Sequence, residues 1–136
     1  MKVLLALMFF PRGGSAQVTR YLAKNLADNG WEARVADKDR FNRLVGNASR
    51  TVVVLKNGRV IGFARALCDE VSNGYIGTVA VAEEMRGLGI GREMVRRLVG
   101  DDPQITWVLR SGRDSGGFWE KMGFLPSKDA MERKRV

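Results

Sequence analysis

Three alternating glycines within residues 87–91 are the feature that most constrains how this chain folds. They follow an apolar strand, predicted over residues 75–82, and precede an amphipathic helix. Glycine has no Cβ atom, so such a loop exposes backbone N–H groups and lets a ligand approach the main chain. The helix adds the unpaired N–H groups of its first turn and the positive end of its dipole. The pattern therefore favours phosphate binding, with Arg86 and Arg92 as flanking positive charges.

Two common phosphate-binding motifs do not fit this spacing. The dinucleotide-binding motif G-x-G-x-x-G would need a glycine where the chain has Arg92. The Walker loop ends in Gly-Lys-Ser/Thr, whereas the last glycine here precedes Arg92 and Glu93. What remains is Arg-x-x-Gly-x-Gly over residues 86–91, directly after a strand that ends in Val-Ala-Val. Taken alone, this pattern is equally compatible with a flexible helix entry that holds no ligand.

Composition restricts the chemistry that the chain can perform. A chain of 136 residues with 45% hydrophobic content corresponds to one domain with a real core. The absence of histidine excludes catalytic triads, proton shuttles and metal sites that depend on a histidine side chain. The single cysteine, Cys68, cannot form an internal disulfide or a thiolate cluster, which fits a reducing cytoplasm and predicts no metal site. Cys68 ends an apolar strand, so packing is favoured over nucleophilic chemistry.

The net charge of +8 favours polyanionic partners. Coenzyme A, nucleic acid and a membrane surface are all polyanionic. The basic residues are scattered, however, and the longest basic run is residues 133–135 at the C-terminus, a pattern typical of a solvated end. Nucleic acid is therefore the less favoured partner. No apolar run approaches the ~20 residues that a membrane span requires.

The N-terminal third predicts a strand and two helices. The apolar run at residues 3–10 is interpreted as a buried strand rather than a signal peptide, because Pro11-Arg12 interrupts the approach to a cleavage site. Residues 17–29 show helical periodicity and stop at Gly30. Asp37 is a candidate N-cap for a short helix that extends to about Val45.

The remainder predicts a mainly antiparallel sheet. Strands at residues 51–56 and 59–67 are joined by Asn57-Gly58, a strong hairpin signal. The strand before the glycine loop comes next, and the helix after the loop leads to a strand at residues 105–110 that should run parallel to it. A short helix from Ser115 should end at Gly123, and residues 124–133 should return as one or two edge strands. The fold class is therefore α/β of the α+β type, with a mixed sheet flanked by helices.

A second motif, Phe-Trp-Glu-Lys-Met-Gly-Phe, occupies residues 118–124. Together with residues 86–91, in this order and at this spacing, it resembles the GNAT superfamily of N-acetyltransferases, over roughly residues 51–124. The resemblance implies a GNAT-like sheet, a single acyl-CoA N-acyltransferase-like domain over residues 1–136, and a homodimer paired through C-terminal strands. It also implies transfer of an acetyl group from acetyl-CoA to a primary amine of a small molecule or protein. Residues 1–32 separately look like the opening strand, glycine loop and first helix of a GT-B glycosyltransferase.

The GNAT resemblance implies a cofactor site made largely of backbone groups. One backbone amide of the strand would polarise the thioester carbonyl, and the glycine loop would hold the pyrophosphate. The residues implied are Val79, Ala80, Val81, Arg86, Gly87, Leu88, Gly89, Ile90, Gly91, Arg92 and Trp119. Trp119 stands where many members of the superfamily have a tyrosine that protonates departing coenzyme A. An indole N–H is not a usable proton source, so Trp119 is equally interpreted as a packing residue.

Candidate catalytic groups are therefore sought elsewhere. The carboxylates nearest to the expected cleft are Asp69, Glu70, Glu83 and Glu84, and each is also explained as a solvated loop or helix-start charge. Asp69 and Glu70 are the candidate bases, while Tyr75, Ser111 and Ser115 are candidate proton donors to the thiolate. For the acceptor side, the resemblance implies a wall that includes Trp31, Phe41 and Arg43. The missing tyrosine leaves a non-catalytic coenzyme A-binding or interaction module as the alternative, and a basic nucleic-acid-binding domain as a weaker one.

Overall fold

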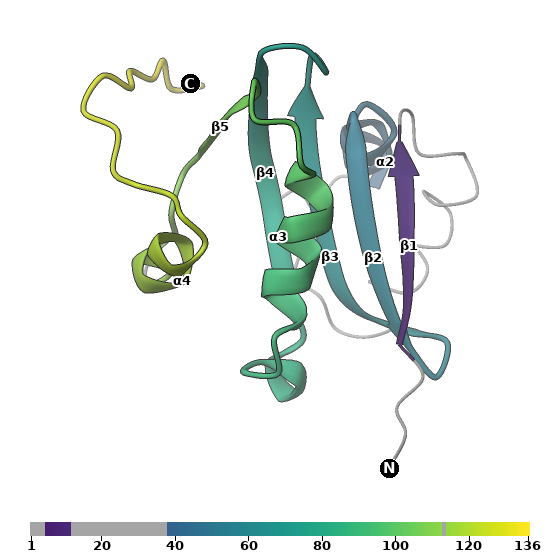
Figure 1. Cartoon of the computed structure of the whole chain (residues 1–136). Helices are drawn as coiled ribbons and strands as arrows, with labels where there is room; N and C mark the ends of the chain where they lie inside the picture. The colour runs from purple at the N-terminus through teal and green to yellow at the C-terminus, as the bar shows by residue number, and fades with distance from the viewer. Residues whose placement is uncertain (1–4, 12–37, 113) are drawn as a thin grey trace.

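The computed structural model describes residues 5–11, 38–112 and 114–136 of the chain (Figure 1). The elements in order are β1 (Leu5–Pro11), α2 (Lys38–Gly46), β2 (Arg50–Lys56), β3 (Arg59–Cys68), β4 (Asn73–Val81), the 3-10 helix η1 (Glu83–Met85), α3 (Ile90–Val99), β5 (Thr106–Leu109) and α4 (Gly116–Lys121).

The strands form one sheet in the order β1-β2-β3-β4-β5, in which only the β4–β5 pair is parallel. The β2–β3 hairpin turns at Asn57 and Gly58, whose φ values of 51° and 75° are both left-handed. Two consecutive left-handed residues define the type I′ turn that matches the twist of paired strands. The predicted hairpin is confirmed, as are the parallel return strand and the mainly antiparallel sheet.

Helix α3 covers one face of the sheet (Figure 1). Its apolar residues Met94, Val95 and Leu98 are fully buried, at 0–1% exposure. They belong to one hydrophobic cluster with side chains of the four consecutive strands from β2 to β5, and this cluster is the main core of the described chain. The spacing of these residues along α3 makes one helical face, as the sequence predicted.

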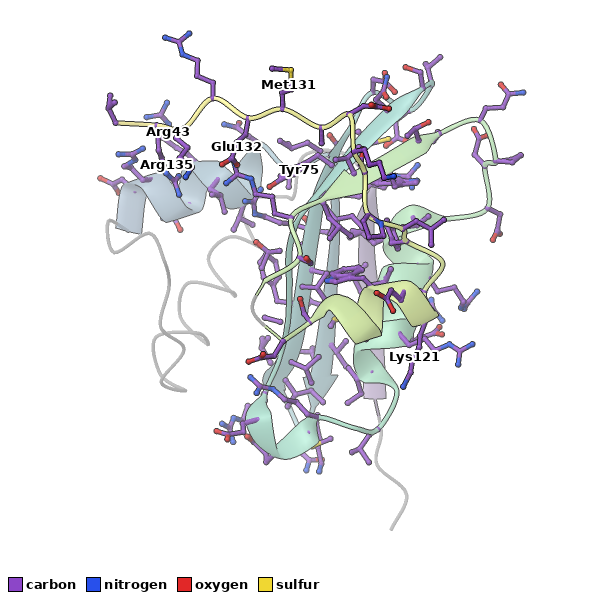
Figure 2. All side chains as sticks on the ribbon, turned by 90° about the vertical axis from the view of Figure 1, so that its left-hand side faces the viewer. Arg43, Tyr75, Lys121, Met131, Glu132 and Arg135 are labelled. Carbon is purple, nitrogen blue, oxygen red and sulfur yellow. The ribbon has the colours of Figure 1, made fainter. Side chains whose placement is uncertain are left out.

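Helix α2 lies on the opposite face of the sheet. Figure 2, which views the sheet along its edge, shows α2 on one side and α3 on the other. Val45 and Ala48, at the end of α2 and just beyond it, are 0% and 2% exposed. The other face of the described sheet includes the side chains of Thr51, Arg65 and Thr78, which lie on three adjacent strands.

The predicted C-terminal edge strands are absent. Residues 124–136 contain no strand, and after Phe124 every one of them is exposed. Pro126 removes a backbone donor, and the charged residues that follow do not favour burial. An ion pair between Arg110 and Glu132 holds this segment near the end of β5. The outer edge of β5 is thus unpaired within the described residues.

Several expectations fall outside the described residues. They are the helix at residues 17–29, the Asp37 cap, Trp31, and most of the GT-B-like segment. Among the helices that are described, none is long and apolar enough to cross a bilayer. The described residues also contain no group of three or more potential metal ligands.

Candidate active site

Strand β4 separates from β5 halfway along its length. The pairing begins at Asn73↔Thr106 and ends at Ile76↔Leu109, although β4 continues to Val81. Beyond this point β5 leads away toward α4 (Figure 1). The backbone of residues 77–81 therefore has no β5 partner along that edge. An extended ligand would find a row of unpaired N–H and C=O groups there.

A β-bulge lies at the same point of β4. Across the β3–β4 pair, Arg65 opposes Thr78 whereas Ala66 opposes Ile76, so Gly77 is the extra residue. A bulge bends the strand and changes the direction of the side chains that follow it. Strand β4 thus carries two local irregularities at one place, the bulge on its β3 side and the loss of pairing on its β5 side.

The glycine loop lies at the far end of β4. Gly87 and Gly89 adopt left-handed conformations with φ of 76° and 81°. Gly89 is the N-cap of α3, and no side chain caps the first turn, so its N–H groups lack a side-chain acceptor. A Cβ atom built at either glycine would meet no described heavy atom within 4 Å. Open space, bare backbone and uncapped N–H groups are together the features typical of an anion-binding loop.

The remaining residues implied for the cofactor surround this loop. The Arg86 side chain donates from Nε to the Val81 carbonyl at 3.3 Å, which holds it across the start of the loop. Leu88 and Arg92 are exposed, Ile90 is buried, and a Cβ atom built at Gly91 would lie 3.5 Å from the Phe118 ring of α4. Val79 and Val81 pack partly against the α3 core. The structure thus brings the predicted loop and strand residues together along β4 and the start of α3.

The second sequence motif, residues 118–124, contains the C-terminus of α4, and the backbone there forms a Schellman cap. Gly123 has φ of 88°, and the N–H of Phe124 donates to the Trp119 carbonyl at 3.0 Å while the N–H of Gly123 donates to Glu120. The rings of Trp119 and Phe124 meet edge to face at 5.3 Å, which is the apolar contact that accompanies this motif. Trp119 also contacts Phe118 edge to face at 4.9 Å. Its packing role is thereby explained without a catalytic one.

Asp69 and Glu70 lie at the opposite end of β4 from the glycine loop. The Asp69 carboxylate accepts hydrogen bonds from Ser72, Asn73 and Val71, and these bonds lower its pKa well below the ordinary range. Such a carboxylate closes the β3–β4 loop and is a poor base near neutral pH. The two candidate bases are therefore not assembled with the glycine loop.

Glu70 forms an ion pair with Arg50, whose Nε and Nη2 donate to the two carboxylate oxygens at 3.0 Å and 2.5 Å. Nη1 of Arg50 donates to the carbonyls of Leu98 and Val99, each at 2.8 Å, at the C-terminus of α3. The guanidinium also lies 5.2 Å from the centroid of the Trp107 ring. This arrangement fastens the end of α3 to β2, to the β3–β4 loop and to β5. Glu70 has a structural partner in the described chain.

The structure also shows where the remaining candidate serines and glutamates lie. Ser115 donates its hydroxyl to the Gly112 carbonyl at 2.9 Å and so closes the turn before α4. Glu83 and Glu84 are exposed in η1, one turn before the glycine loop, and Glu84 pairs with Arg59 at 3.5 Å. Ser111 is exposed in the loop after β5.

Tyr75 lies closer to the bulge than any of these candidates, two residues before Gly77. Its ring lies on the face opposite α3, because Gly74 and Ile76 point toward Trp107 and the α3 core. It is 38% exposed. Of the candidate proton donors, Tyr75 alone is on the strand that bears the proposed thioester contacts.

Arg65 is a polar residue of this region that the sequence reasoning missed. Its Nε donates to Oγ1 of Thr78 at 3.2 Å, and burial lowers the pKa of the guanidinium from its ordinary value. The signal was available, since Arg65 is a charged residue in the middle of an otherwise apolar stretch of β3. Its position beside the bulge depends on cross-strand register.

The fold and site define a class of protein: a mixed α/β acyltransferase with an opened β4–β5 pair and a glycine-rich loop at the start of α3. Comparison with known proteins agrees. The model of the acetyltransferase (GNAT) family matches residues 18–124. The chain belongs to the GNAT family, and its reaction class is acetyl transfer.

Similar proteins are found in algae, plants and bacteria. An uncharacterised N-acetyltransferase, ycf52, of Pyropia yezoensis is 27% identical over 123 residues, covering 85% of this chain and 70% of the relative. The chloroplastic serotonin N-acetyltransferase 2 of Oryza sativa subsp. japonica is 35% identical over 77 residues, which cover 54% of this chain and 38% of the relative. A predicted acetyltransferase from Clostridium acetobutylicum, crystallised with acetyl-CoA, superposes with a TM-score of 0.69 at 18% identity and covers 96% of each chain.

Proposed function

We propose that this enzyme uses acetyl-CoA as the acetyl donor and a primary amine, of a small molecule or a protein, as the acceptor. The observation that carries the proposal is the glycine loop, with its left-handed Gly87 and Gly89 beside an uncapped helix start. The Clostridium structure with acetyl-CoA supports the choice of donor. The absence of any described heavy atom within 4 Å of a Cβ built at Gly87 or Gly89 further supports a phosphate-binding role for this loop.

Different groups along β4 and the glycine loop would bind different parts of acetyl-CoA. Backbone N–H groups of Gly87, Gly89 and the first turn of α3 would hold the pyrophosphate, with Arg86 and Arg92 adding positive charge. The unpaired edge at residues 77–81 would hold the pantetheine arm by backbone hydrogen bonds. One N–H in the Val79–Val81 stretch would donate to the thioester carbonyl, where negative charge develops during attack.

Two proton transfers complete the reaction. The acceptor nitrogen attacks the thioester carbon, the C–S bond breaks, and the nitrogen loses a proton while the sulfur gains one. We propose that Tyr75 donates the proton to the sulfur and is restored by the proton that the nitrogen releases, because Trp119 is held in aromatic contacts and its indole N–H is not a usable acid. The acceptor enters as the neutral amine, since Asp69 and Glu70 are engaged at the other end of β4.

Binding and turnover test the proposal separately. We expect acetyl-CoA, but not acetate or ATP, to raise the melting temperature, because a ligand bound to the native state alone stabilises it. With an amine panel, free thiol should appear faster than in the enzyme-free control. Absence of any thermal shift at millimolar acetyl-CoA would contradict the donor assignment. Binding without thiol release would favour the non-catalytic coenzyme A module instead.

Three further properties are proposed on narrower grounds. One domain over residues 1–136 is supported by the single sheet that joins elements from both ends of the described chain. A homodimer is supported by the unpaired outer edge of β5, which sedimentation equilibrium would test. A cytoplasmic location is supported by the free Cys68 thiol, which cell fractionation would test.

A further inference from the structure

Arg65, on β3, lies beside the one place on β4 where both irregularities of that strand meet. Its Nε is bonded to Thr78, the residue next to Val79, so the guanidinium is held one residue away from the proposed thioester-binding stretch. A Cβ atom built at Gly77 would come within 2.8–2.9 Å of Cζ, Nη1 and Nη2. The guanidinium plane therefore rests on the bare backbone of the bulge, and the absence of a side chain at Gly77 makes room for it.

The described residues around Arg65 leave its two terminal nitrogens without a hydrogen-bond acceptor. Across the described ranges 5–11, 38–112 and 114–136, the only hydrogen bond from Arg65 is the one from Nε, and no carboxylate forms an ion pair with it. Burial removes part of its hydration, which disfavours the charged form. A partly buried guanidinium without an acid is costly, and an anion that accepts from both terminal nitrogens would offset that cost.

A second observation on the same face concerns Thr51, which lies directly opposite Arg65 across the β2–β3 pair. Thr51 is 1% exposed, and its Oγ1 is buried with no hydrogen-bond partner in the described part of the chain. The same holds for Oδ1 of Asn42 on α2, the helix on this side of the sheet. Buried polar oxygens are normally satisfied, so this face has hydrogen-bonding capacity that the described residues leave unused.

This face is also the side from which an acceptor would reach the thioester. The other face is filled by α3, and the side chains of Val79 and Val81 pack against that core. Arg65, Gly77 and Thr78 occupy the opposite face beside the same stretch of β4. Groups on this face would therefore contact the acceptor and the reacting thioester group, not the pyrophosphate end of the donor.

Building on the proposed acetyl transfer, we propose that the acceptor carries a carboxylate close to its amine, as amino acids do, and that Arg65 binds this carboxylate. The guanidinium fork donates from Nη1 and Nη2 to the two carboxylate oxygens, while Nε continues to donate to Thr78. The same positive charge disfavours an ammonium ion next to it, so it selects against purely cationic amines and favours the neutral nucleophile. The acceptor is thus chosen by charge at a point adjacent to the reacting atoms.

Matched acceptors test this specificity. The probes are free amino acids and dipeptides, each compared with its C-terminal carboxamide, which keeps the shape and removes the charge. We expect kcat/KM to be about 10- to 100-fold higher for the carboxylates, the range of a charge-assisted hydrogen-bonded pair. The comparison is biased against the proposal, because the amine of a carboxamide is the less basic one and is more often neutral. Equal or better use of the carboxamides would overturn it.

Variants then assign the preference to Arg65. Arg65→Gln should remove it, with most of the change in KM for the carboxylates, and Arg65→Lys should restore part of it. Arg97→Gln is the matched control, since it removes the same charge from α3 on the other face while Glu93 keeps its bond from Arg96. A preference that survives in Arg65→Gln would overturn the assignment.

Two readouts separate this proposal from the proposed function. Arg65→Gln should keep the wild-type melting temperature shift with acetyl-CoA, whereas failure of acetyl-CoA to bind the wild type would reject the donor assignment itself. If acetyl-CoA binds but no amine in the panel is acetylated, the proposal is tested by calorimetry, in which N-acetyl amino acids and their carboxamides are titrated into the coenzyme A complex. N-acetyl amino acids should bind more tightly than their carboxamides, and equal affinity would overturn the proposal.

Discussion

Replacing Gly89 with glutamate tests the glycine loop most directly. The residue has φ of 81°, and a left-handed conformation costs a non-glycine residue about 1–2 kcal/mol. No described atom lies within 4 Å of the added Cβ, so no clash is expected to add to this cost. For a chain of this size, we expect the melting temperature to fall by about 5 °C. The variant should still fold.

The effect on ligand affinity should be much larger than the effect on stability. A carboxylate about 5 Å from a phosphate costs about 3 kcal/mol at an effective dielectric constant of about 20. That energy corresponds to a roughly 150-fold increase in the dissociation constant for acetyl-CoA. Isothermal titration calorimetry at fixed ionic strength measures it, and desulfo- and dephospho-coenzyme A would show which end of the ligand is affected.

Gly58→Glu is the matched control for this experiment. Gly58 has φ of 75° and open space around its Cβ position, but it lies in the β2–β3 turn. Its glutamate variant should lose a similar amount of stability and keep full affinity for acetyl-CoA. An affinity of Gly89→Glu within about 3-fold of the wild type, at comparable stability, would refute the assignment of the loop as the pyrophosphate site.

The remaining predictions concern a proton donor, a structural ion pair and a pH dependence. Tyr75→Phe should lower kcat by about 10-fold or more with unchanged acetyl-CoA affinity, whereas an unchanged kcat would reject Tyr75 as the acid. Arg50→Met should lower the free energy of unfolding in urea by about 2–3 kcal/mol, because it leaves Glu70 and the α3 carbonyls without their donor; Arg50→Lys should lose less. Hydrogen bonds from Arg96 lower the pKa of Glu93 to about 2 from 4.5, so its stabilising contribution is complete above pH 4.5 and is lost as the pH falls toward 2. Glu93→Gln should make acid unfolding less steep in that range, and an unaltered acid titration would contradict this reasoning.

Local signals in the sequence predicted the turns and the helix ends. Asn57 and Gly58 specify their turn because both positions need positive φ, which few residue types tolerate. Gly123 specifies the end of α4 in the same way, through its φ of 88°. The glycine loop was predictable because its three glycines lie within a short stretch between a strand and a helix.

Features that depend on partners distant in the chain were not predictable. Glu70 resembled a free loop carboxylate, but its partner is Arg50, 20 residues earlier. Proximity in sequence was also misleading for Asp69, because each strand residue advances the chain by about 3.3 Å and so separates it from the Val79 region by about 20 Å. The edge strands expected after Phe124 required pairing partners that a single sequence does not reveal. Arg65 acquires its place only through the register of β3 against β4.

The extra residue in β4 also sets the phase of everything downstream of it. Side chains alternate along a strand with a period of two, so one inserted residue exchanges the inward and outward sets. If Gly77 were paired as an ordinary strand residue, Val79 and Val81 would turn away from α3, and Ala80 would take their place in the interior. The glycine that accommodates a guanidinium on one side, as an extra residue, therefore also keeps the two valines packed against the helix on the other, and pairing it into the ladder would lose both arrangements together.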